Sequence, residues 1–211
     1  MRRMLVAAAF AALFVVQASP SIKIALDRTE MLASGRPILL AVETRDPRDL
    51  FRGEYSILNY EVGRPRNLLT SPGALGAACN LQKSPTCFVS GDRDVYVRLE
   101  PDATGVHRGV EVLFERPADG VTYIAGEARS GTVSLAGAGR SEPKCDKDAC
   151  FEGAIVYGIE NWFGPQGVPA KVDRIDRNDI VVRVRLDPQG RPALDALVVK
   201  GEDFGRTARL W

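Results

Sequence analysis

The chain has 211 residues, of which 45% are apolar and 26% are charged. These values are close to the averages of globular proteins, and they exclude a wholly disordered chain. Basic residues number 28 and acidic residues 27, so no net field attracts a polyanion, and aromatic residues at 7% offer little surface for stacking bases. The composition gives no support to nucleic-acid binding, and it allows one large or two small domains.

The N-terminal segment, residues 1–34, has the layout of an export signal. Arg2 and Arg3 precede an uncharged apolar run over residues 4–16, and Ala18 is suited to a signal-peptidase site. The run has 13 residues. A helix that spans a bilayer needs roughly 20. The short length of the apolar run favours a cleaved signal peptide, with the remainder of the chain exported.

The apolar character continues past this run, which leaves open an uncleaved membrane anchor. Residues 22–26 are mostly apolar, and Lys23 can extend its charged end to the membrane interface. Pro20 is suited to the first turn of a second helical piece, and Gly35 to the position just after its end. The sequence predicts a helical segment over residues 1–34, followed by an exported domain over residues 35–211.

Beyond Gly35, apolar and polar residues alternate with a period of two. The alternation covers residues 38–43, 95–100, 110–115 and 180–186, and turn formers such as Asp187-Pro188-Gln189-Gly190 separate such segments. This pattern is typical of strands with one buried face. Apart from the N-terminal segment, only residues 68–81 have a helical pattern. The predicted fold class is all-β: an antiparallel β-sandwich or barrel-like domain with an N-terminal hydrophobic helix.

Two similar runs lie one hundred residues apart. Phe51-Arg52-Gly53 and Phe151-Glu152-Gly153 each open a strand pattern, and each is followed by a strand-turn-strand pattern. The similarity predicts two related β units, at about residues 35–117 and 121–201. Unrelated strand-turn-strand units also resemble one another, so the sequence leaves a duplication and a chance likeness both open.

Four cysteines form two close pairs. Cys79 and Cys87 lie eight residues apart, Cys145 and Cys150 lie five apart, and both pairs are surrounded by loop formers. In an oxidising compartment this predicts two disulfide bonds, although four cysteines allow three connectivities. A zinc site would require closer spacing, and the single histidine, His107, is distant in sequence. We expect no metal and no cofactor.

Residues 46–60 form the most distinctive stretch of the chain. They contain the pattern Gly-x-Tyr-x-x-Leu-x-Tyr, which is carried by Gly53, Tyr55, Leu58 and Tyr60. The pattern resembles the signature of the GDYXXLXY family of bacterial membrane proteins, with Glu54 in place of the aspartate. Residues 157–167 are similar to a second block of that family. The resemblance implies no activity.

An N-terminal membrane anchor is usual in that family. The resemblance therefore implies that the N-terminal segment stays in the inner membrane, with the main domain in the periplasm. The alternative is a soluble periplasmic protein after signal cleavage.

Both blocks allow a structural and a functional interpretation. In the structural interpretation, Leu58 and Tyr60 share one face of a strand and fill the core, while Trp162 covers one end of the β domain. In the functional interpretation, Arg52 and Glu54 present charges to a partner, and the second block lines a shallow groove for a sugar or peptide. The candidate recognition residues are Arg52, Gly53, Glu54, Tyr55, Leu58, Tyr60, Tyr157, Glu160 and Trp162.

No residues assemble into a recognisable catalytic set. His107 lies in a predicted turn, and Ser56 would need a lysine facing it from a neighbouring strand. Carboxylate pairs such as Glu54 and Glu160 occur in any chain with 27 acidic residues. We expect a membrane-anchored envelope protein whose β domain binds another envelope or membrane protein. The alternatives are a hydrolase of an envelope substrate, acting through carboxylates or Ser56, and a purely structural subunit.

Overall fold

The computed structural model describes residues 2–45, 55–71, 84–138, 148–163, 168–172, 174–176 and 178–206. These ranges contain the helices α1 (Arg2–Ser34) and α2 (Pro169–Val172), a 3-10 helix (Glu61–Gly63) and eleven strands. The strands are β1 (Arg36–Arg45), β2 (Tyr55–Tyr60), β3 (Leu68–Thr70), β4 (Thr86–Pro101), β5 (Val106–Leu113), β6 (Tyr123–Leu135), β7 (Ala149–Val156), β8 (Asn161–Phe163), β9 (Ile180–Leu186), β10 (Pro192–Val199) and β11 (Glu202–Arg206). The chain is therefore mostly β, as the alternation predicts.

Five consecutive strands close into a barrel. The order is β5-β3-β7-β6-β4, and β4 pairs with β5 to complete the ring. β3 runs parallel to β5, and the other pairs are antiparallel. Fully buried side chains fill the interior because alternate residues on each strand point inward. They include Val95, Val97, Val112, Ile124, Val133 and Phe151.

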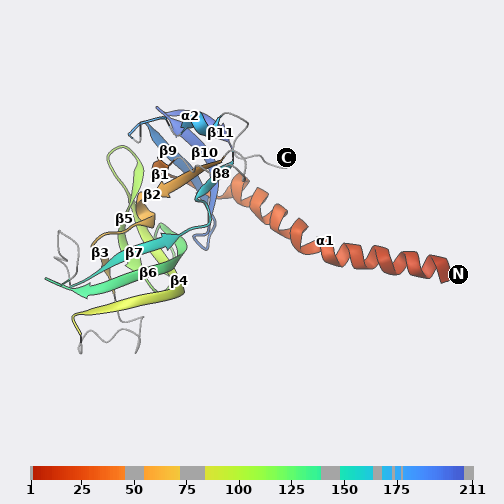
Figure 1. Ribbon diagram of the computed structural model, residues 1–211, viewed down its shortest axis with the longest axis horizontal. Helices are drawn as coiled ribbons and strands as arrows, with labels where there is room; N and C mark the ends of the chain where they lie inside the picture. The colour runs from red at the N-terminus through yellow and green to blue at the C-terminus, as the bar shows by residue number, and fades with distance from the viewer. Residues whose placement is uncertain are drawn as a thin grey trace.

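A second sheet adjoins the barrel and uses strands from both ends of the chain. Its order is β11-β10-β9-β1, and β1 also pairs with β2, which pairs with β8. β1 joins this sheet to the barrel through a short parallel pairing with β5, in which Leu39 is opposite Val106. The indole of Trp162 in β8 lies against Gly205 in β11. Figure 1 shows the second sheet beside the barrel.

Helix α1 packs on the second sheet only near its C-terminal end. Thr29 and Leu32 are 3% and 2% exposed, and an Arg28 guanidinium nitrogen donates to the Pro192 carbonyl at 3.0 Å. Strand β10 follows Pro192 and is buried from residue 192 to residue 198, whereas β9 alternates between buried and half-buried residues. Helix α1 packs against β10. Because both faces of β10 are then covered, its residues do not show the alternation expected of a half-exposed strand.

The N-terminal segment is one continuous helix rather than two pieces. Pro20 lies inside α1, and the Ser19 hydroxyl donates to the Val16 carbonyl instead of capping a second helix. The helix ends at Ser34, and the Gly35 amide donates to the Met31 carbonyl at 2.8 Å. A proline in the interior removes one helical hydrogen bond and bends the axis, and α1 bends along its length in Figure 1.

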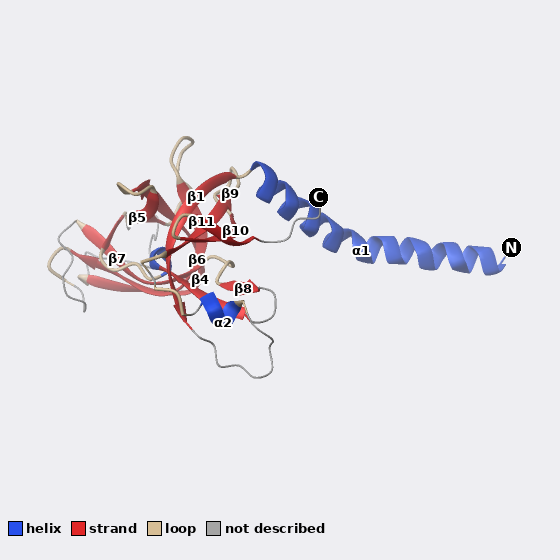
Figure 2. Cartoon of the chain, turned by 90° about the horizontal axis from the view of Figure 1, so that it is seen from above, coloured by secondary structure: helices blue, strands red, loops and turns tan. Residues whose placement is uncertain are grey.

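Most of α1 projects away from the β domain, as Figure 2 shows. The large apolar side chains along this part are between 45% and 71% exposed. They are Phe10, Leu13, Phe14, Val15, Val16, Ile22, Ile24 and Leu26. Within the described ranges, no helix combines the length and the apolarity required to cross a bilayer.

The structure differs from the expected helix over residues 68–81 and does not test the expected duplication. Residues 68–81 carry a helical pattern, but residues 68–70 form β3, because they add a strand between β5 and β7. Residues 72–83 lie outside the described ranges. The duplication stays a prediction: the barrel takes β4 and β5 from one expected half, residues 35–117, and β6 and β7 from the other, residues 121–201.

Candidate functional site

The structure brings the two distinctive sequence blocks together. β2 carries the first block and pairs antiparallel with β8 of the second, with Tyr55 opposite Phe163 and Ser56 opposite Trp162. The Leu58 amide adds a hydrogen bond to the Glu160 carbonyl at 2.7 Å. Residues more than one hundred positions apart in the sequence thus form one two-stranded unit of the second sheet.

Two buried tyrosines fasten this unit to its surroundings. The Tyr60 hydroxyl donates to the Ile159 carbonyl at 2.9 Å, and the Tyr157 hydroxyl donates to the Val62 carbonyl at 2.8 Å. Burial raises the pKa of both phenols well above the usual value, and the nearby Glu160 carboxylate raises it further. Both hydroxyls therefore stay protonated, and they act as hydrogen-bond donors that hold loops in place.

Glu160 has a structural contact of its own. Its carboxylate accepts the Tyr157 amide at 2.5 Å, which closes the short loop between β7 and β8. Across the helix interface, burial lowers the pKa of the Arg28 guanidinium, an effect that the Tyr60 phenol partly opposes. The polar groups around Glu160 thus serve the junction of α1, β2 and β8.

Burial decides between the two interpretations for several candidate residues. Leu58 is fully buried, and Tyr60, Tyr157 and Trp162 are 3%, 7% and 3% exposed. The groove predicted along the second block is therefore not formed by Tyr157 and Trp162, because both rings pack into the fold. As the structural interpretation predicts, Leu58 and Tyr60 belong to the core.

The outward part of the β2–β8 unit is accessible. Phe163 is 71% exposed, Asn161 is exposed, and Ile57 is half-buried. The predicted charged corner of Arg52, Gly53 and Glu54 lies outside the described residues, immediately before Tyr55. Among the described residues of this unit, Phe163 is the large apolar side chain that a partner can reach.

Ser56 does not have the surroundings of a nucleophile. It is fully buried, and its hydroxyl donates to the Pro169 carbonyl at 3.3 Å. A buried hydroxyl that donates to a backbone carbonyl has neither a base nor access to substrate. The geometry gives no support to a hydrolase that uses Ser56.

His107 is a residue of strand β5 and not of a turn, because the strand begins at Val106. It lies opposite Leu40, and its Nδ1 atom has no hydrogen-bond partner in the described part of the chain. Burial lowers the pKa of His107, and the positive charge of Arg36 lowers it further. Across the described residues, no three His, Cys, Asp or Glu side chains gather as a metal site requires.

Two of the four cysteines lie in described strands. Cys87 is opposite Val133, and Cys150 is opposite Ser134, so β6 separates them. Successive residues of β6 point to opposite faces, and two strand spacings amount to about 9.5 Å, beyond the roughly 7 Å that a disulfide allows between Cα atoms. A bond between Cys87 and Cys150 is therefore excluded, although neither is a free thiol. Cys79 and Cys145 lie outside the described residues.

A cleft that the sequence analysis missed lies where α1 meets the β domain. Its volume is about 590 Å³, and it is lined by residues 27–36, 120–123 and 186–191. The first segment is the end of α1 with the start of β1, and the other two are turns. The turn formers at residues 118–120 and 187–190 and the helix end at Gly35 can each be identified from the sequence, but no pattern predicts that these three distant segments meet.

The fold and the paired blocks define a β-barrel protein with a second sheet and a projecting N-terminal helix. The family model described as GDYXXLXY protein matches residues 17–197. The chain belongs to the GDYXXLXY family, which confirms the resemblance drawn from residues 46–60. No curated protein and no solved structure matches the chain.

Proposed function

We propose that this protein is a membrane-anchored envelope protein whose periplasmic β domain binds another envelope or membrane protein. The observation that carries the proposal is the projecting part of α1, where residues as large as Phe10 and Phe14 are 69% and 71% exposed. Leaving such side chains in water is costly, at about 1.5–3 kcal/mol for each. The hydrocarbon of a membrane removes this cost, and the basic N-terminus, Arg2 and Arg3, suits the cytoplasmic side.

The binding surface that we propose is the outward part of the β2–β8 unit. Its support is the 71% exposed Phe163, paired in register with Tyr55 and next to the charged sequence of residues 52–54. Exposed aromatic residues beside charged ones are typical of protein interfaces. A hydrolase lacks such support, because Ser56 is buried.

We further propose that the exported domain carries two disulfide bonds. The support is that Cys87 and Cys150 are not free thiols and are too far apart to bond with each other. Each then requires Cys79 or Cys145 as its partner. The short spacings favour Cys79 with Cys87 and Cys145 with Cys150.

Cell fractionation tests the anchor. The protein should stay in the membrane pellet after carbonate extraction, and its intact mass should include residues 1–34. A soluble product that begins at Ser19 would show signal cleavage and refute the anchor.

A pull-down from membrane extracts tests the binding surface. Phe163→Ala should lose the partner that the unchanged protein retains, while its melting temperature stays the same. Phe88→Ala in β4 is the matched control, because Phe88 is 66% exposed on the barrel. The proposal fails if both variants retain every partner.

A further inference from the structure

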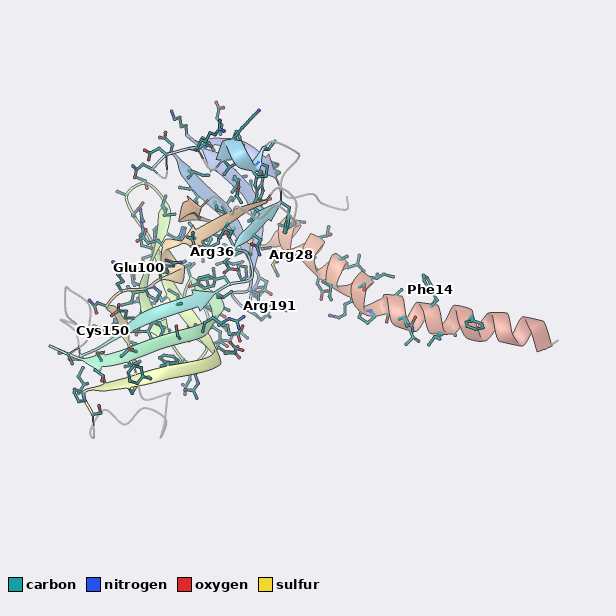
Figure 3. The ribbon with its side chains drawn as sticks, in the orientation of Figure 1. Phe14, Arg28, Arg36, Glu100, Cys150 and Arg191 are labelled. Carbon is teal, nitrogen blue, oxygen red and sulfur yellow. The ribbon has the colours of Figure 1, made fainter. Side chains whose placement is uncertain are left out.

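The cleft at the base of the β domain has walls from three parts of the chain. α1 and the start of β1 contribute Glu30 and Arg36, the β5–β6 turn contributes Val121, and the β9–β10 turn contributes Asp187 and Arg191. Figure 3 labels Arg36, at the start of β1, and Arg191, in the β9–β10 turn, and both line this one cleft. Its volume of about 590 Å³ lies within the range of small-ligand sites.

Two of the walls are held together by a fixed network. The Tyr123 ring packs so closely on Gly190 that a Cβ there would lie 2.3 Å from it, and Gly190 has a φ of +74°. Arg116 donates both to the Tyr123 hydroxyl at 2.9 Å and to the Pro188 carbonyl at 3.0 Å. The Gly190 carbonyl accepts the Ala125 amide at 2.8 Å. The cleft is therefore preformed, which reduces the entropy lost on binding.

The cleft presents unpaired charges of both signs. The Arg36 guanidinium makes no hydrogen bond or ion pair with any described residue, and the same holds for the Glu30 carboxylate. Among the described residues, the Arg191 guanidinium donates only through its Nε atom, to Asp187 at 2.6 Å, so its terminal nitrogens have no partner there. A ligand that satisfies the cleft needs an anionic group for the guanidinium groups and a cationic group for the carboxylate.

The position of the cleft along α1 identifies the source of such a ligand. Residues 4–26 contain a single charged residue, Lys23, and at 1.5 Å per residue they extend about 34 Å, close to the thickness of the hydrocarbon core. Asp27, which lines the cleft, is the next residue. The helical segment from Asp27 to Ser34, which forms this wall, is about 10 Å long and would then lie at the level of the lipid headgroups. Val121 is 39% exposed at the tip of the facing turn.

We propose that this cleft binds the zwitterionic headgroup of a phospholipid with a primary amine, of the phosphatidylethanolamine type. The phosphate lies between Arg36 and Arg191, whose planar guanidinium groups match its oxygens. The ammonium group donates to Glu30. The proposal rests on the membrane anchor proposed above, because the anchor sets the level of the cleft. The headgroup site adds a specific lipid contact that holds the β domain against the membrane leaflet facing that domain.

Lipid retention by the full-length protein tests the site. The chain is reconstituted in nanodiscs of phosphatidylcholine with a minor fraction of phosphatidylethanolamine, transferred to mild detergent, and its retained lipid is measured by mass spectrometry. We expect phosphatidylethanolamine to be enriched at least tenfold over its fraction in the disc. The double variant Arg36→Ala/Arg191→Ala should reduce this enrichment to less than twofold.

Two further variants define the chemistry. Glu30→Gln should retain phospholipid but lose the preference for the amine headgroup, because the ammonium loses its acceptor. Arg64→Ala removes an exposed arginine outside the cleft and should behave like the unchanged protein. Inorganic phosphate added during the transfer should not displace the lipid; if it does, the site is a phosphate site and the proposal is overturned. Equal retention by the unchanged protein and the double variant also overturns it.

Carbonate extraction of the same protein separates this proposal from the anchor. If the protein stays in the pellet but shows no lipid enrichment, the headgroup site is refuted and the anchor is not. Protein that is extracted but still enriches the lipid refutes the anchor and leaves the headgroup site standing.

Discussion

The hydroxyl of Tyr60 tests how the two sequence blocks are held together. It donates at 2.9 Å to the Ile159 carbonyl, and the side chain is 3% exposed. Tyr60→Phe keeps the ring but leaves the carbonyl without a donor, which costs about 1–3 kcal/mol for a buried acceptor. We expect the free energy of unfolding in urea to fall by about 2 kcal/mol. The control is Tyr96→Phe in β4. Tyr96 is half-buried and its hydroxyl has no hydrogen-bond partner among the described residues, so we expect a change within about 0.5 kcal/mol.

The same substitution should change the dependence of stability on high pH. Burial raises the pKa of Tyr60 in the folded protein, while in the unfolded chain it stays at about 10. The stability that this difference supports is fully present below pH 10 and is lost as the pH rises further, because the unfolded chain ionises first. Each such tyrosine lowers stability by about 1.4 kcal/mol per pH unit in this range.

Above pH 10, the free energy of unfolding of the Tyr60→Phe variant should therefore decrease less steeply with pH than that of the unchanged protein. Urea unfolding at several pH values measures this difference. Tyr157, which is buried in the same way, keeps its own contribution in this variant. An alkaline slope identical to that of the unchanged protein, together with a loss no larger than that of Tyr96→Phe, would refute the reasoning.

Gly190→Ala should lower the free energy of unfolding by at least about 2 kcal/mol more than Gly105→Ala does. Both glycines have positive φ, but only at Gly190 would the added Cβ lie 2.3 Å from a ring, that of Tyr123. Equal losses in urea unfolding would contradict this. Hydrogen bonds from the Thr104 side chain and amide lower the pKa of Asp102 to about 2. The stability from these bonds is present above the unfolded pKa of about 3.9 and is lost as the pH falls toward 2, so an NMR titration midpoint near 4 would count against them. Thiol labelling of the denatured, unreduced protein should modify no cysteine if both proposed disulfides exist, whereas labelling of Cys79, Cys87, Cys145 and Cys150 excludes them.

Local patterns predicted the parts of the fold that depend on one strand and one buried face. The alternation over residues 180–186 coincides with β9, because this strand has the core on one side only. Gly35 marks the end of α1, because a Cβ there would lie 2.4 Å from the Met31 carbonyl. The position of Tyr60 on the same strand face as Leu58 predicted that both are buried.

Features that depend on distant segments could not be predicted in this way. The pairing of Ser56 with Trp162 requires knowledge of which strand lies beside β2, and no local pattern carries that information. The sequence suggests a helix over residues 68–81, yet residues 68–70 form a strand because they pair with β5 and β7 on either side. The cleft has the same origin, since Arg36 and Arg191 come to line one cavity only after the sheets have formed.

The position of β1 has a consequence for the order in which the molecule forms. The barrel strands are contiguous in the sequence, from β3 to β7, so its pairings are complete once residue 156 has been synthesised. β1 pairs with β9 between Arg36 and Leu186, 150 residues apart, and must wait for the last quarter of the chain. Contacts of such long separation form slowly because loop closure precedes them. The barrel should thus mature first, and until β9 arrives the long edge of β1 stays open to mispairing and to proteases, next to α1.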